Sequence, residues 1–172
     1  MLASFWLNSN MRLAFLLLVS TLCLRGEFLR IDVSFEDIGC ASCLESLEGR
    51  LRRVRGVERV EIDAAKGVAK LYLEPGNKAR LAPLLSRIAQ DGTKILDIRV
   101  EARGTIGSGR PGPLFQPSGL AETYRLRLPA DSKAAFEPGA IYKIAGAVSE
   151  IAPAEQPVLE ADSVTLDSTA RE

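Results

Sequence analysis

The sequence predicts an α+β domain followed by a Gly/Pro-rich linker and a small β-rich extension. Two observations support this fold class. Between residues 29 and 101, the alternating apolar residues typical of strands are interrupted twice by apolar residues at helical spacing. Beyond that point, residues 103–119 are rich in Gly, Pro and Ser, a composition typical of a flexible linker.

Four strands are expected in the first part of the chain. Each combines apolar residues at every second position with polar residues between them, as half-buried strands do. The turn-like residues 64–67 separate the second strand from the third, which predicts a β-hairpin. The expected strands are residues 29–36, 57–62, 69–73 and 96–100.

Two amphipathic helices are expected between these strands. The first covers residues 41–54, with an apolar stripe that Gly56 ends, and the second covers residues 81–88 and is ended by Gly92. Pro83 falls in the first turn of the second helix, where a missing N–H is tolerated. The apolar stripes are formed by Leu44, Leu47, Leu51 and Val54, and by Leu81, Leu84, Leu85 and Ile88.

The resulting order, β-α-β-β-α-β over residues 29–101, is that of ferredoxin-like folds, in which both helices cover one face of a four-stranded antiparallel sheet. In such a unit, the loop with Cys40 and Cys43 and the loop of residues 91–94 lie at the same end of the sheet. We therefore expect these two loops to meet.

The two ends of the chain carry different signals. Arg12 followed by the apolar residues 13–24 predicts a signal peptide or an N-terminal anchor within residues 1–26. This apolar run is shorter than the roughly 20 residues that a spanning helix needs. At the other end, residues 120–166 contain three strand-like stretches and form the expected extension, and residues 167–172 are expected to be frayed.

Composition excludes several classes of function. The chain of 172 residues has 22 basic and 22 acidic residues, so no strongly basic surface is expected and nucleic acid is not an expected partner. It has no histidine, which removes the commonest general base and the usual nitrogen ligand of metals. We therefore expect a protein that is not an enzyme.

Cys40 and Cys43 are the candidate functional residues. They are three positions apart at the junction between the first strand and the first helix, where unpaired N–H groups favour thiolate over thiol. Two thiolates at this spacing suit a soft ion of low coordination number, such as Cu(I), whereas a structural zinc site needs four ligands. The remaining cysteine, Cys23, lies in the apolar N-terminal run.

The cysteine pair in this strand–loop–helix setting resembles the heavy-metal-associated domain family. The resemblance extends through residues 56–62, 69–75 and 88–92 and covers residues 29–100. That family includes copper chaperones, modules of copper-transporting ATPases and periplasmic mercury-binding proteins. The resemblance implies that Cys40 and Cys43 bind Cu(I), or Hg(II), Zn(II) or Ag(I), and pass it to a metal-transporting ATPase or another metal-accepting protein.

The chain departs from the family pattern at several positions. Ile38 stands where the family has a buried Met, and Asp37 stands in the place of a Gly and adds negative charge beside the thiols. Thr93 follows Gly92 where the family often has Tyr, Phe or Lys, and Lys94 comes next. These differences bear on which metal is bound and how tightly.

The sequence therefore predicts an extracytoplasmic protein, periplasmic or secreted, that binds a soft metal ion for transport, transfer or sequestration. It would touch a membrane only through an uncleaved N-terminal segment. Two alternatives remain open. One is a structural or partner-binding domain whose cysteines form a disulfide, and the other is a thiol-disulfide oxidoreductase that uses the same Cys-x-x-Cys pair.

Overall fold

The structure is a computed structural model that describes residues 27–36, 38, 40–129, 135–149 and 156–168. The expected signal peptide or anchor, with Cys23, lies outside the described residues, as does most of the expected frayed tail. No helix within the described ranges is long and apolar enough to cross a membrane.

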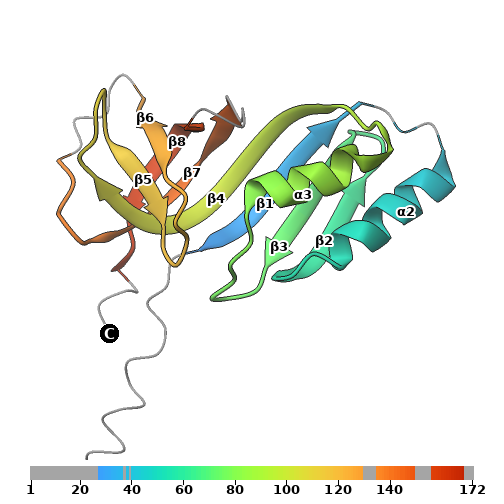
Figure 1. The fold of residues 1–172 in the computed structure, drawn as a ribbon, viewed down its shortest axis with the longest axis horizontal. Coiled ribbons are helices and arrows are strands. Elements are labelled where there is room, and N and C mark those ends of the chain that lie inside the picture. Colours follow the sequence, from blue (N-terminus) through green and yellow to red (C-terminus); the bar gives the residue numbers. More distant parts are fainter. Residues whose placement is uncertain (1–26, 37, 39, 130–134, 150–155, 169–172) are drawn as a thin grey trace, which may run out of the picture.

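The described residues form eight strands and two α-helices, the second of which continues into a short 3₁₀ turn (Figure 1). Their positions follow the apolar periodicity of the sequence closely. The elements are β1 Phe28–Phe35, α2 Ala41–Arg52, β2 Val57–Asp63, β3 Val68–Leu73, α3 Leu81–Ile88, the 3₁₀ turn Ala89–Asp91, β4 Ile95–Gly107, β5 Leu114–Pro117, β6 Tyr124–Arg127, β7 Ile141–Ser149 and β8 Val158–Leu166.

All eight strands belong to one mixed sheet in the order β2-β3-β1-β4-β5-β6-β8-β7. The pairs are antiparallel except β6 with β8, which is parallel. Strand β7 also pairs with β4, from Arg99↔Ala147 to Thr105↔Ile141. The last five strands therefore close into a ring, and β4 belongs both to this ring and to the flatter part of the sheet formed with β1, β3 and β2.

The predicted fold class is wrong. The chain is not a ferredoxin-like βαββαβ sandwich followed by a linker and a separate small extension, because one eight-stranded sheet runs through all of these parts. The fourth strand does not end near residue 100 but continues for 13 residues to Gly107. Residues 114–117, placed in the expected linker, form β5 and pair with β4. The domain limits at 29–101 and 120–166 stay predictions.

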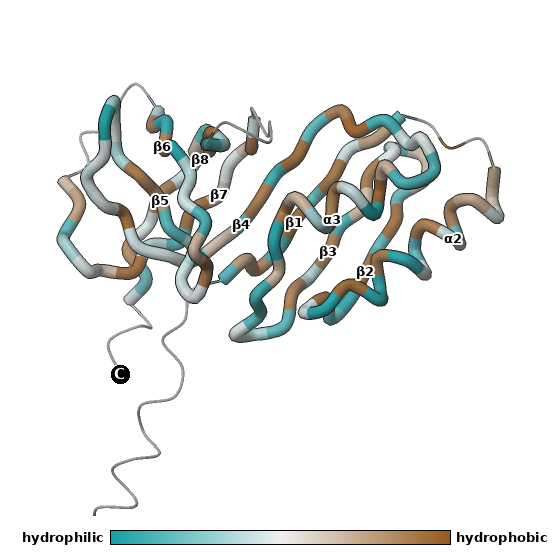
Figure 2. Tube along the Cα trace, in the orientation of Figure 1, coloured by the Kyte–Doolittle hydropathy of each residue, from teal (hydrophilic) through white to brown (hydrophobic). Residues whose placement is uncertain are grey.

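Helices α2 and α3 cover one face of the sheet beside β2, β3 and β1 (Figure 1). Leu47 and Leu51 of α2 are completely buried, and so are Leu84 and Ile88 of α3. Figure 2 shows hydrophobic residues recurring along the strands and along both helices. Each fully buried leucine contributes about 2 kcal/mol of transfer free energy, so this interface fixes α2 on the sheet.

Leu96 departs from the expected alternation of β4. The sequence pattern placed it on the apolar side with Ile98 and Val100, but its exposed fraction is 58%. The pairing of β1 with β4 shifts register between Ser34 and Phe35, so that Phe35 pairs with Ile95. The irregularity turns Leu96 outward at the end of the sheet where β1 leads into the cysteine loop.

Gly104 allows β4 and β5 to approach closely within the ring. A Cβ atom at this position would collide with the carbonyl oxygen of Gln116 and with the ring of Phe115, which is completely buried. Gly107, on the same strand, has no atom within 4 Å of an added Cβ. Gly104 is thus required for packing within the ring, although it belongs to the Gly/Pro-rich stretch that was expected to be a linker.

We expect Gly104→Ala to lower the free energy of unfolding by about 1–3 kcal/mol, because the neighbouring backbone and ring must move to make room. Urea denaturation monitored by far-UV circular dichroism measures the change. The matched control, Gly107→Ala, should change stability by less than about 1 kcal/mol. Equal effects of the two substitutions would contradict this account of the ring.

Candidate functional site: the Cys40–Cys43 pair

The cysteine pair lies at the amino end of α2, at the end of the molecule away from the ring (Figure 1). Cys40 is the N-cap residue, with extended backbone angles of φ −140° and ψ 119°. Its carbonyl accepts hydrogen bonds from the N–H groups of Cys43 and Leu44 at 3.1 and 3.2 Å, which starts the helix. Cys43 is therefore within the first turn, as the sequence predicts.

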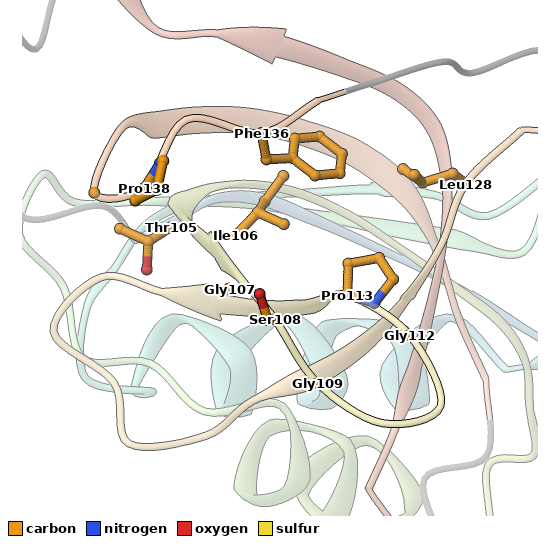
Figure 3. A pocket seen from close by; sticks show the side chains of 11 residues that line it. Thr105, Ile106, Gly107, Ser108, Gly109, Gly112, Pro113, Leu128, Phe136 and Pro138 are labelled. Carbon is orange, nitrogen blue, oxygen red and sulfur yellow. The ribbon is translucent and has the colours of Figure 1, made fainter.

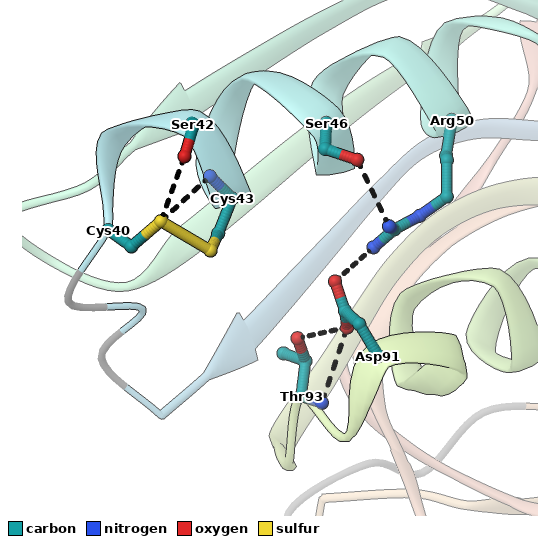
Figure 4. Close-up of a disulfide and its surroundings, with 7 residues drawn as sticks. All are labelled: Cys40, Ser42, Cys43, Ser46, Arg50, Asp91 and Thr93. Carbon is teal, nitrogen blue, oxygen red and sulfur yellow. Dashed lines mark hydrogen bonds and ion pairs between the residues drawn. A yellow bond between two sulfur atoms is a disulfide. The ribbon is translucent and has the colours of Figure 1, made fainter.

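The two sulfur atoms are joined as a disulfide, with 5.2 Å between the Cα atoms (Figure 4). The Cys43 N–H donates to Cys40 Sγ at 3.2 Å, and the Ser42 hydroxyl lies 3.1 Å from the same sulfur. Because a disulfide sulfur has no proton, Ser42 is the donor in this contact. Two donors thus face Cys40 Sγ, and no sequence pattern indicated the role of Ser42.

The surroundings favour negative charge on these sulfurs. Both cysteines are half-buried, while Ala41 and Ser42 are exposed, so the pair is open to solvent on one side. The first turn of α2 contains no acidic residue. No carboxylate within this first turn therefore neutralises the positive end of the helix dipole, which can act on a thiolate.

Ile38 anchors the loop that leads to the pair. Its side chain is half-buried and packs against the hydrophobic core, as expected for a residue in the slot of a buried Met. The Cys40 N–H donates to the Ile38 carbonyl at 2.7 Å, which tightens the turn before the helix. Asp37 and Gly39, on either side of Ile38, lie outside the described residues.

The loop after α3 meets the cysteine end of the sheet, as expected. The Glu36 N–H donates to the Lys94 carbonyl at 3.0 Å, and Lys94 Nζ lies 2.6 Å from the Glu36 carboxylate. The hydrogen bond from Lys94 Nζ to the Glu36 carboxylate, together with the negative charge of Glu36, raises the pKa of Lys94. Lys94 is thus engaged by Glu36 rather than by the sulfurs.

Asp91 links the same loop to α2 (Figure 4). Its carboxylate accepts a hydrogen bond from Arg50 at 2.5 Å and another from the Thr93 hydroxyl at 2.7 Å. These two hydrogen bonds lower the pKa of Asp91 from 3.8 to about 2, and the one from Arg50 makes the larger contribution. Arg50 and Asp91 are 41 positions apart, so no local sequence pattern indicates this ion pair.

Within the described part of the chain, no group of three or more His, Cys, Asp or Glu side chains is placed to hold a metal ion. Cys40 and Cys43 alone form the candidate ligand set. A two-sulfur set leaves a four-coordinate ion such as Zn(II) with open positions but fits an ion that accepts two ligands.

A cavity of about 730 Å³ lies at one end of the ring (Figure 3). Ile106, Leu128 and Phe136 form its apolar wall, and Ser108 stands at the glycine-rich turn that edges it. None of its described lining residues has an ionisable side chain, so these residues provide no acid, base or charged ligand. The cavity lies far from the cysteine pair in the fold.

Comparisons with protein-family models, with curated proteins and with solved structures found no match for this chain. The resemblance to the heavy-metal-associated domain family therefore depends on the residues quoted above and on nothing else.

We expect Asp91→Asn to lower the free energy of unfolding at pH 7 by about 1 kcal/mol, a value reduced for solvent screening because the Asp91 side chain is 35% exposed. A lowered pKa in the folded state stabilises the protein above the pKa of the unfolded state, 3.8, and this stabilisation is lost as the pH falls toward 2. The difference between variant and parent should therefore disappear between pH 4 and pH 2.

Urea denaturation at pH 7, 4 and 2.5 measures this difference. Asp97→Asn is the matched control, because Asp97 is exposed at the same end of the sheet and has no ion-pair partner among the described residues. A difference for Asp91→Asn that stays constant down to pH 2.5 would show that the Arg50–Asp91 pair is not the cause.

Proposed function

We propose that the reduced Cys40–Cys43 pair binds one soft metal ion, Cu(I) in the first place, and that the protein carries or sequesters this ion outside the cytoplasm. The observation that carries the proposal is the position of two half-buried cysteines, one at the N-cap and one in the first turn of α2. Thiolates are the ligands that Cu(I) prefers, and a helix amino end stabilises them.

A monovalent ion at this site would be held without a cationic side chain. Two thiolates and one Cu(I) carry a net charge of −1 in this simple count. Lys94 on the neighbouring loop and Arg50 on α2 are engaged by Glu36 and Asp91. The Cys43 N–H and the Ser42 hydroxyl then provide the local stabilisation of the extra charge.

A shallow site with two ligands also suits transfer. The exposed side of the pair leaves space for the thiolate of an acceptor to bind the ion before Cys40 or Cys43 releases it. We propose as acceptor a metal-transporting ATPase or another metal-accepting protein. Ag(I), Hg(II) and Zn(II) are the other thiophilic candidates, with Zn(II) disfavoured by the two missing ligands. The extracytoplasmic location is inferred from residues 1–26 alone.

Competition titration of the fully reduced protein with a chromophoric Cu(I) chelator, under anaerobic conditions, tests the proposal. We expect one Cu(I) per chain. Cys40→Ser and Cys43→Ser should each lower the affinity for Cu(I) by at least about 100-fold, because loss of a directly bound ligand costs more than loss of an outer-shell contact. Ser46→Ala, one turn along α2, is the matched control and should bind as the parent does. A Cys40→Ser protein that binds Cu(I) with unchanged affinity would rule out this site.

The disulfide supports a second candidate, a domain in which the closed pair has only a structural role. The contribution of the disulfide to the free energy of unfolding distinguishes this structural role from metal binding. In the chain-entropy description, closing a loop of four residues contributes about 2 kcal/mol at 25 °C.

We therefore expect reduction of the disulfide to lower the free energy of unfolding by no more than about 2 kcal/mol. Urea denaturation of the Cys23→Ser protein, with and without a phosphine reductant, measures the change. A loss above about 4 kcal/mol, beyond the upper range for short loops, would favour the structural role instead.

A further inference from the structure

The backbone around the cysteine pair suits both an open and a closed state. The Cα atoms of Cys40 and Cys43 are 5.2 Å apart, within the usual range for a disulfide of about 4.4–6.8 Å. Residues three positions apart on any helix are close neighbours at about this spacing. Opening the disulfide therefore requires no change in the path of α2, whose first turn is held by its own hydrogen bonds.

The closed pair and a metal-bound pair exclude each other. A metal ion needs thiolates as ligands, and a disulfide contains none. Two sulfur–metal bonds of about 2.3 Å on opposite sides of an ion hold the sulfurs up to about 4.6 Å apart, more than twice the length of a disulfide bond. The same two atoms cannot satisfy both distances.

Small redox reagents can reach the pair. Cys40 and Cys43 are half-buried, and the exposed Ala41 and Ser42 lie between them on the surface turn. Thiol-disulfide exchange requires such access, because the attacking thiolate must approach along the disulfide. The site is thus open to a disulfide oxidant and to a thiol reductant alike.

We infer that the Cys40–Cys43 disulfide is a redox switch that turns off soft-metal binding, and that a thiol reductant turns binding on again. This inference rests on the proposed function. In the closing reaction, one cysteine thiolate attacks a small disulfide RSSR and releases one RS⁻. The second cysteine thiolate then attacks the mixed disulfide and releases the other RS⁻. The pair is oxidised by two electrons, RSSR is reduced to two thiols, and excess RSH reverses both steps.

Metal binding and oxidation are linked in both directions. An ion held by both thiolates removes the nucleophiles that would attack RSSR, so a loaded site resists closure. Conversely, the disulfide form cannot bind the metal ion until it is reduced. The reciprocity follows from the competition of two events for the same pair of sulfurs.

The full chain with Cys23→Ser, which leaves only Cys40 and Cys43, allows a direct test. One sample is fully reduced and another is closed with excess oxidised glutathione, and both are desalted. Acid quenching, alkylation and intact mass spectrometry count the free thiols. Ag(I), which is thiophilic and keeps its oxidation state, is then added to each sample, and the bound metal is measured after a second desalting step.

We expect one Ag(I) per reduced chain, less than one tenth of that in the oxidised chain, and full recovery after treatment with dithiothreitol. Protein loaded with Ag(I) beforehand should lose its thiols to oxidised glutathione at least tenfold more slowly than the metal-free protein. Cys43→Ser is the matched variant, because it can form a mixed disulfide at Cys40 but cannot resolve it.

The outcomes separate the switch from the proposed function. If the reduced protein binds neither Ag(I) nor Cu(I), the proposed function is overturned and the switch with it, even if the disulfide forms. If reduced and oxidised proteins bind Ag(I) equally, the switch alone is overturned. If the parent protein stops at the mixed disulfide with glutathione, as Cys43→Ser does, the pair does not close and the switch is again overturned.

Discussion

The main-chain hydrogen bonds of β4 hold the whole structure together. This strand pairs with β1 along one part of its length, with β5 near its end and with β7 over its middle. At its beginning, the register with β1 places Ile95 opposite Phe35 and brings the Lys94 carbonyl to the Glu36 N–H. The loop before α2, and with it the amino end where Cys40 lies, is positioned by that pairing. The location of the thiols thus depends on a strand far from them in sequence.

Much of the local structure could be predicted, because periodicity reports directly on which side of a segment is buried. The stripe from Leu81 to Ile88 marked α3, and the alternation around Val33 marked β1. The fold class could not be predicted in the same way. The pairing of β4 with β7 joins residues about 40 positions apart, and nothing in a local pattern encodes it. Gly104 was assigned to a linker because the sequence does not distinguish a glycine required for close packing from one that provides flexibility.

The candidate site shows the same division. The cysteine spacing located the pair and its place at the start of a helix, since both follow from neighbouring residues. The contacts that tune the site come from side-chain geometry. Ser42 reaches Cys40 Sγ, and Arg50 of α2 forms an ion pair with Asp91 after α3. Lys94 is held by Glu36, a partner 58 positions away, so its orientation could not be derived from its position after Gly92.

The double role of β4 has a consequence for any attempt to study the cysteine-bearing half by itself. Residues 99–101 pair with β1 on one side and with β7 on the other. A fragment that stopped at Glu101 would keep the first set of pairings and lose the second, leaving a row of unpaired amides and carbonyls along a strand that is normally covered on both sides. Exposed strand edges of this kind pair readily with other chains, so such an excised fragment would gain an edge for self-association that β7 covers in the intact protein.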